Sequence, residues 1–245
     1  MATTNTVNAL RSAPGKHLAQ KRTLTSNQCD NAEKMMAAKI NTVLSTLAVP
    51  ADVTGGASMA AFELTALTTE RLLLRRLASA DAVALHAVFS DPEVMHYWSS
   101  TPWSTLEQAH EYIADADVAL ASGTMLRLGI ECAASGQLIG QVALYRFDQQ
   151  NRRCDVGYAL GRAHWGRGYL SEALAAMLGH GFTALDLNRV EADIDPRNCA
   201  SARALERLGF RHEGLMRERW IVGGEVCDTA FYGLLRRDWQ ARPSR

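Results

Sequence analysis

The spacing of apolar residues in the first part of the patterned region predicts one strand followed by two helices. Residues 71–77 are strand-like, and Ser79 can cap a helix over residues 81–89. Ser104 and Glu107 have the spacing of a capping box, which would open a second helix. One side of that helix carries Leu106, Ala109, Ile113, Ala116 and Leu120.

Three strands are predicted next, over residues 125–132, 137–147 and 152–160. The two connections are Ala-Ala-Ser-Gly and Asp-Gln-Gln-Asn, which is the chemistry of tight turns. Strands joined by such short turns pair with their chain neighbours in antiparallel order. We therefore expect an antiparallel meander in this part of the chain.

In the last third of the chain, the pattern of apolar residues predicts a helix, a strand, a short helix and a hairpin. Residues 189–195 alternate as a strand, and a helix is expected over residues 200–208. Residues 211–222 and 227–235 would form a hairpin joined by two adjacent glycines. The first helix of this series has a continuous apolar face, made by Leu170, Ala173, Leu174, Met177 and Leu178.

Residues 1–58 differ in composition from the rest of the chain. They are rich in Thr, Asn, Ser and Ala and poor in aromatic residues, which favours disorder. We predict a disordered N-terminal extension there, or a misassigned start with Met59 as the natural one, followed by one domain over residues 59–245. The residues before Asp30 include basic ones but no acidic ones, so a transit peptide is a further alternative.

Composition and charge narrow the classes of function. The chain has 26 basic and 26 acidic residues, and this balance favours neither nucleic acid nor a membrane as a partner. No apolar run is long enough to cross a bilayer. The five cysteines form no Cys-x-x-Cys pair and the seven histidines have no ligand spacing, so no metal site or disulfide framework is predicted. We expect a cytoplasmic protein with reduced thiols.

The stretch from Tyr158 to Ala173 holds the strongest candidate chemistry. A predicted strand ends at Leu160, glycines stand at Gly166 and Gly168, and an amphipathic helix follows. The start of a helix presents N–H groups without helical acceptors, and glycines let a phosphate approach them. A phosphorylated ligand is the first hypothesis, and a tight turn needed only for packing is the competing one.

The chain resembles the GNAT acyl-CoA N-acyltransferase superfamily in three motifs that occur in the family's order. These are residues 158–173, Asp195-Pro-Arg-Asn-Cys-Ala-Ser201 and Leu208-Gly-Phe210. Two segments are similar to the ribosomal-protein-alanine acetyltransferase branch, namely Trp165-Gly-Arg-Gly-Tyr169 and Asp228-Thr-Ala-Phe-Tyr-Gly-Leu-Leu235. The resemblance extends over residues 68–239.

This resemblance implies a mixed α/β (α+β) GNAT fold, with a largely antiparallel twisted sheet of about seven strands and helices on both faces. It implies that acetyl-CoA lies where the strand ending at Leu160 diverges from the strand starting at Arg189. The glycine turn would bind the pyrophosphate, and the strand backbone would pair with the pantetheine arm and polarise the thioester. The implied acetyl-CoA-binding residues are Gly157, Tyr158, Ala159, Leu160, Trp165, Gly166, Arg167, Gly168, Tyr169, Asn198 and Ser201.

Two positions depart from the family pattern. The family places Gln or Arg three residues before the first motif glycine, where this chain has Ala163, and the adjacent Arg162 can substitute. Many relatives have a tyrosine acid seven residues after the motif asparagine, where this chain has Leu205. A tyrosine acid at that position is therefore excluded.

The expected catalytic residues are Ser201, Asn198 and Asp193. By resemblance, Ser201 and Asn198 reach toward the pantetheine and the sulfur, and Ser201 would donate a hydrogen bond to the leaving thiolate. An ordinary helix cap is the competing role for these two residues.

The base that deprotonates the amine is expected on the strand over residues 189–195. Glu191, Asp193 and Asp195 alternate there with apolar residues, so they project from one face, and Asp193 is the central candidate. A merely solvated strand face competes with this role. Two alternatives to Asp193 as the proton acceptor are Glu218 of the last hairpin and direct loss of the proton to solvent.

The resemblance implies acetyl transfer from acetyl-CoA to a primary amine through a ternary complex. The expected acceptor is the N-terminal α-amine of a protein, in particular a ribosomal protein. His96, Trp98 and Trp103 would line the acceptor pocket, or are simply buried. The alternatives are a small-molecule, antibiotic or amino-acid N-acetyltransferase and a non-catalytic acyl-CoA-binding module, as a monomer or a homodimer.

Overall fold

The computed structural model describes residues 66–242. The chain divides into two units, Met1–Ala57 and Ser58–Arg245, and all described residues lie in the second unit. The predictions for residues 1–58 therefore concern a part of the chain outside the described residues. No helix within residues 66–242 has the length and apolar character needed to cross a membrane.

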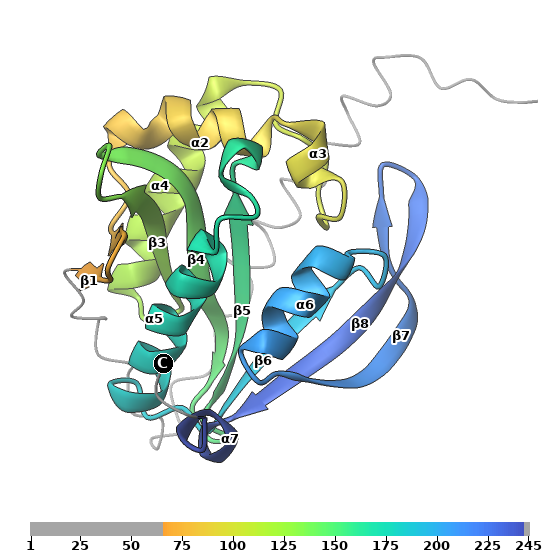
Figure 1. Cartoon of the computed structure of the whole chain (residues 1–245). Coiled ribbons are helices and arrows are strands. Elements are labelled where there is room, and N and C mark those ends of the chain that lie inside the picture. Colours follow the sequence, from red (N-terminus) through yellow and green to blue (C-terminus); the bar gives the residue numbers. More distant parts are fainter. Residues whose placement is uncertain (1–65, 243–245) are drawn as a thin grey trace, which may run out of the picture. The chain divides into compact units, whose positions relative to one another are not determined.

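Eight strands form one sheet in the order β1-β2-β3-β4-β5-β6-β8-β7 (Figure 1). All neighbours are antiparallel except β5 and β6, which run parallel. Seven strands match predicted ones, and β1 is additional because three residues are too few to show an alternating pattern. The strands are β1 (Ala66–Thr68), β2 (Leu72–Arg75), β3 (Met125–Cys132), β4 (Gln137–Asp148), β5 (Arg153–Leu160), β6 (Arg189–Ile194), β7 (Arg211–Val222) and β8 (Glu225–Leu235).

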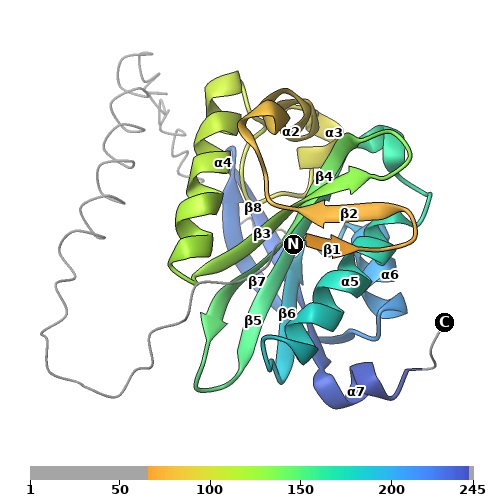
Figure 2. The ribbon, with the colours of Figure 1, turned by 90° about the vertical axis from the view of Figure 1, so that its left-hand side faces the viewer.

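Helices cover both faces of the sheet, as predicted. Helices α2 and α4 lie on one face, and α5 and α6 lie on the other (Figure 2). The short α3 and α7 are not predicted, since one helical turn leaves no periodic pattern. The helical segments are η1 (Ser79–Asp81), α2 (Ala82–Phe89), α3 (Pro92–Met95), α4 (Leu106–Ala121), η2 (Arg162–His164), α5 (Tyr169–Thr183), α6 (Cys199–Arg207) and α7 (Arg236–Gln240).

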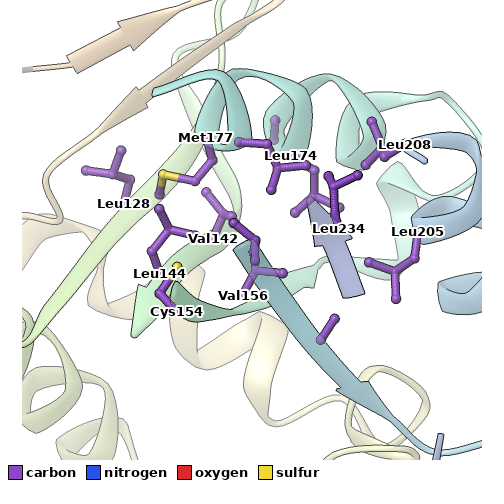
Figure 3. Close-up of a cluster of buried hydrophobic side chains, with 14 of the residues drawn as sticks. Leu128, Val142, Leu144, Cys154, Val156, Leu174, Met177, Leu205, Leu208 and Leu234 are labelled. Carbon is purple, nitrogen blue, oxygen red and sulfur yellow. The ribbon is translucent and has the colours of Figure 1, made fainter. Parts of the chain in front are cut away.

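The larger apolar core lies between α5 and the sheet. Leu174 and Met177 of α5 belong to the same buried cluster as Val142 and Leu144 of β4 (Figure 3). Each such side chain contributes roughly 1.5–3 kcal/mol by leaving water. This burial fixes α5, and with it the turn that precedes α5, against the middle of the sheet.

The opposite face of β4 has a different chemistry. Because side chains alternate along a strand, Gln141, Ala143 and Tyr145 point to the side of α2 and α4. A smaller apolar cluster under α2 and α4, which includes Phe89 and Ile113, covers only part of this face. The remaining part, with two polar side chains, is available to form a site.

Strands β5 and β6 part after three pairs of residues. The last pair joins Asp155 to Glu191, whereas β4 stays paired with β5 as far as Leu160. From Val156 onward, the edge of β5 that faces β6 therefore has no strand partner. This is the gap that the family resemblance implies.

Helix α4 begins one residue later than the capping-box prediction places it. Thr105 is the cap residue rather than Ser104, and its N–H donates to Oε1 of Gln108 at 3.1 Å. The prediction is wrong because two overlapping pairs, Ser104 with Glu107 and Thr105 with Gln108, both have the spacing of a capping box. Leu106 thereby becomes the first helical residue and is exposed, whereas the other four predicted apolar-face residues are buried.

Candidate active site

A cavity of about 1200 Å³ is lined by the end of β5, the start of α5 and α6. Arg203 and Arg207, both exposed on α6, bring positive charge to it. Eight of the residues predicted to bind acetyl-CoA line this cavity: Tyr158, Leu160, Trp165, Gly166, Gly168, Tyr169, Asn198 and Ser201.

The turn between β5 and α5 has a left-handed backbone at both of its glycines. The φ angles are 72° at Gly166 and 81° at Gly168, a region that other residues avoid. A Cβ placed on Gly166 would meet no atom within 4 Å, so the backbone is open to the cavity. The first helical bond runs from the N–H of Glu172 to the Gly168 carbonyl. The N–H groups of residues 166–171 are therefore available to an anion, whereas the N–H of Trp165 donates to the Arg162 carbonyl.

Arg71, which precedes β2, holds this turn in place. Its guanidinium forms an ion pair of 2.6 Å with Glu172 and donates to the Arg167 carbonyl at 3.0 Å. It also lies 4.7 Å from the centre of the Tyr169 ring. Burial raises the pKa of the Glu172 carboxyl, but hydrogen bonds from Thr69 and Arg71 outweigh burial and hold this pKa below its usual value. Glu172 is therefore ionised at neutral pH and keeps Arg71 in position.

Trp165 covers one end of the open edge of β5. Its indole Nε1 donates to the Leu160 carbonyl at 2.7 Å. Between this bond and the last β5–β6 pair, the backbone of residues 156–159 has no partner strand on the β6 side. An extended ligand could pair with this segment as an added strand would.

Ser201 makes one hydrogen bond through its backbone N–H and one through its hydroxyl. Its N–H donates to Oδ1 of Asn198 at 3.0 Å, the cap bond, and its hydroxyl lies 2.6 Å from the hydroxyl of Tyr158. Burial raises the pKa of Tyr158 to about 12, against a smaller opposing effect of the Ser201 hydrogen bond. The phenol therefore stays protonated at neutral pH and can donate.

A tyrosine hydroxyl is thus present near Ser201 although position 205 holds a leucine. Leu205 is fully buried in the core under α5 and α6. The family resemblance implies a role only for the Tyr158 backbone, so this hydroxyl is not among the predicted features of the site. The alternation of β5 is the signal that could have found it, since it places the Tyr158 side chain on the α6 side of the sheet.

A second cavity of about 390 Å³ lies on the α4 side of the sheet. Its floor is the face of β4 that carries Gln141, Ala143 and Tyr145, and its walls come from residues 96–99 and the β7–β8 hairpin. The predicted Gly157 and Trp98 line this cavity rather than the first one. The two cavities share five lining residues: His96, Tyr97, Tyr158, Asn198 and Ser201.

Asp193 is the carboxylate of β6 that has no ion pair within the described residues. Glu191 and Asp195 each form ion pairs with arginines. Asp193 instead lines the second cavity near Tyr145, whose pKa is raised by burial and by the negative charge of Asp193. Of the three alternating carboxylates, Asp193 is therefore the one that lines the second cavity without an arginine partner among the described residues.

Besides Glu191, five further candidates from the sequence line neither cavity: Trp103, Ala159, Arg162, Arg167 and Glu218. Arg162 forms an ion pair of 3.0 Å with Asp91, and its substitution for the residue missing at Ala163 stays a prediction. Trp103 is partly buried and stacks on Phe89 with ring centres 4.4 Å apart, so packing against the smaller apolar cluster accounts for this residue.

The other three differ in their surroundings. Ala159 belongs to the buried cluster under α2 and α4. Arg167 is exposed, and its carbonyl accepts from Arg71. Glu218 is exposed on β7 at a bulge with φ of 53°, outside the walls of the second cavity. The geometry therefore favours Asp193 over Glu218 as a proton acceptor.

Comparison with known proteins gives consistent matches. A family model described as an acetyltransferase (GNAT) domain matches residues 71–211. The uncharacterized N-acetyltransferase p20 of Bacillus licheniformis is 38% identical over 71% of this chain and 97% of its own length. The ribosomal protein uS5-alanine N-acetyltransferase of Escherichia coli is 26% identical over 71% and 92%, respectively. The structure of Mycobacterium smegmatis RimJ in complex with CoA-disulfide has a TM-score of 0.64 at 25% identity, covering 71% of this chain and 85% of that one.

Proposed function

Because the chain belongs to the GNAT acetyltransferase family, we propose that it transfers the acetyl group of acetyl-CoA to the N-terminal α-amine of a protein. The observation that carries the proposal is the meeting of two cavities at the Tyr158–Ser201 pair. Similarity to the uS5-alanine enzyme supports a ribosomal protein as the acceptor, and the cytoplasm as the place of the reaction. Since both cavities are formed by one chain, a monomer is sufficient.

The first cavity fits acetyl-CoA in its size, charge and backbone geometry. The N–H groups from Gly166 to Tyr169 would hold the pyrophosphate, with Arg203 and Arg207 balancing phosphate charge at the rim. The open edge of β5 would pair with the amides of the pantetheine arm. The thioester would then reach the residues that the two cavities share.

The residues at this meeting point supply what amide formation needs. Asp193 would accept a proton from the ammonium, so that the neutral nitrogen attacks the thioester carbonyl. N–H groups of the open β5 edge would stabilise the oxyanion, and the C–S bond then breaks. Ser201, held by Tyr158, would donate a hydrogen bond to the departing thiolate.

A small-molecule amine is the second candidate acceptor. A volume of about 390 Å³ is enough to enclose a whole small amine, and this observation favours it. A non-catalytic acyl-CoA-binding module is not favoured, because the tyrosine hydroxyl absent at Leu205 is available from Tyr158.

Two glycines allow a matched test of the donor site. Gly166 and Gly136 have φ angles of 72° and 66°, and a Cβ on either would meet no atom within 4 Å. Gly166→Ala and Gly136→Ala should therefore each cost about 1 kcal/mol of stability through backbone strain. Only Gly166→Ala places a methyl group in the proposed pyrophosphate site, so it alone should raise the Kd of acetyl-CoA, by roughly 10-fold or more.

Isothermal titration calorimetry with acetyl-CoA measures this difference. Gly136 lies in the turn between β3 and β4 and lines neither cavity, so its variant controls for the shared strain. Equal acetyl-CoA affinity of the two variants would contradict the assignment of the glycine turn.

A further inference from the structure

Two buried polar atoms at the second cavity have no hydrogen-bond partner within the described residues. They are Oε1 of Gln141 and Nε of Arg127, and both residues line the cavity. Gln141 is only 2% exposed. A buried polar atom without a partner costs stability, so its retention calls for an explanation. The other two such atoms, in His86 and Arg236, line neither cavity.

Gln141 and Arg127 are diagonal neighbours on one face of the sheet. The β3–β4 register pairs Arg127 with Ala143 and Gly129 with Gln141. The guanidinium of Arg127 is fixed from the other side, since its Nη1 donates to the Tyr112 carbonyl at 3.0 Å and its carbon lies 3.6 Å from the centre of the Tyr112 ring. Its Nε is therefore held in place on the same face of the sheet as the Gln141 side chain.

An acceptor oxygen and an N–H donor on one face are complementary to an amide group, which offers one N–H and one C=O. A simple amine offers no carbonyl, and a carboxylate offers no N–H. The same cavity carries the Asp193 carboxylate, which attracts an ammonium. The cavity thus offers partners for an amine and for an amide on one ligand.

We propose that Gln141 and Arg127 bind the first peptide group of the acceptor while its α-amine lies toward Asp193. This inference rests on the proposed function and narrows it to amines that carry an amide on the adjacent carbon. A polyamine or another amine without a carbonyl would leave the Arg127 Nε–H without an acceptor. An amide-bearing acceptor satisfies both buried atoms.

Two acceptors of the same skeleton separate the amide from the amine. Alaninamide and isopropylamine differ at the α-carbon, where a carboxamide in one stands for a methyl group in the other. Gln141→Met, which keeps the length of the side chain, should lower kcat/KM for alaninamide at least about 10-fold more than for isopropylamine. Each acceptor is compared with itself on the wild-type enzyme, so the intrinsic reactivity of the amines cancels.

Gln137→Met is the matched control, because Gln137 lies exposed at the start of the same strand. Gln141→Leu should show the same selective loss of kcat/KM for alaninamide. Both Gln141 variants should keep or raise the thermal midpoint of unfolding, because they remove an unpaired buried amide oxygen. An equal loss with both acceptors, or a wild-type preference for alanine over alaninamide, would overturn the inference alone. Failure of the wild-type enzyme to acetylate any primary amine would overturn the proposed function itself.

Discussion

The hydroxyl pair of Tyr158 and Ser201 joins β5 to α6 where the two cavities meet. If the pair stabilises the leaving thiolate as a unit, Tyr158→Phe and Ser201→Ala should each lower kcat by roughly 10- to 100-fold. The Kd of acetyl-CoA should change by less than about 3-fold, because the backbone provides most of the proposed binding. The double variant should be little slower than either single one. Steady-state kinetics and calorimetry measure these quantities.

Tyr232→Phe is the control for this cycle, since Tyr232 is a buried tyrosine that lines neither cavity. It should leave kcat unchanged. Losses that multiply in the Tyr158/Ser201 double variant would show that the two hydroxyls act independently. An unchanged kcat and an unchanged acetyl-CoA affinity in Ser201→Ala would leave Ser201 with its helix-cap role only.

At the scale of residues, roles that depend on local backbone can be predicted and roles that depend on distant partners cannot. The positive φ angles at Gly166 and Gly168 follow from the composition of a short turn, and Asn198 caps α6 three residues from its partner. The bond between Tyr158 and Ser201 joins residues 43 positions apart. Whether such residues meet depends on how β5 and β6 are paired, which periodicity alone does not specify.

At the scale of elements, one ion-pair cluster joins the helical layer over the second cavity to the sheet. Arg75 of β2 pairs with Asp81 of η1 at 2.8 Å and also with Glu131 of β3. Burial raises the pKa of Asp81, but hydrogen bonds from Arg75 and from the Ala78 N–H outweigh burial, so the net shift is downward. A carboxyl whose pKa is lowered by folding stabilises the fold above its unfolded pKa of about 3.9, and this stabilisation is lost as the pH falls through the folded value.

Asp81→Asn should therefore lower the free energy of unfolding by about 2 kcal/mol at neutral pH. Below about pH 4 the difference from the wild-type protein should shrink, because the wild-type carboxyl becomes protonated as well. Urea denaturation at several pH values measures both effects. Asp117→Asn is the matched control: Asp117 pairs with Arg76, but both side chains are more than half exposed, at 52% and 54%. This variant should cost under about 0.5 kcal/mol, and an equal cost for the two variants would contradict the role given to Asp81.

Elements long enough to repeat a pattern can be predicted from the sequence. The limits of β3 and β7 agree with the predicted residues, and β5 and β6 each differ by one residue. The three residues of β1 and the four of α3 are too short for a period to appear. The start of α4 shows a second limit, since two overlapping capping motifs differ too little in local energy for the sequence to choose between them.

At the scale of the whole described domain, the divergence of β5 from β6 determines from which side of the sheet each substrate would reach the site. The open edge of β5 lies between a large cavity on the α6 side and a smaller one on the α4 side. The family resemblance implies the gap, but it does not predict the residues of the second cavity, because strands and loops far apart in the sequence supply them. Donor and acceptor would enter from different cavities and meet directly, without a covalent enzyme intermediate.

Direct transfer predicts intersecting lines in initial-rate plots and tight binding of a compound that joins the two substrates. CoA linked through its sulfur to the nitrogen of an Ala-starting peptide should bind at least about 100-fold more tightly than either part alone, because one molecule fills both cavities. The Kd of this compound for the Asp193→Asn variant should lie within about 3-fold of the wild-type value, because the compound has no proton to give up. The kcat of the same variant should fall about 10-fold or more.

Cys227 provides the check on a covalent route, because it is the only cysteine among residues 66–242 that lines either cavity. Cys227→Ser should keep the intersecting pattern and most of kcat, since direct attack needs no thiol of the protein. Parallel initial-rate lines together with an inactive Cys227→Ser variant would instead show that the acetyl group rests on the enzyme between two half-reactions. In that case the two cavities would act in turn, and the linked compound would gain little over its parts.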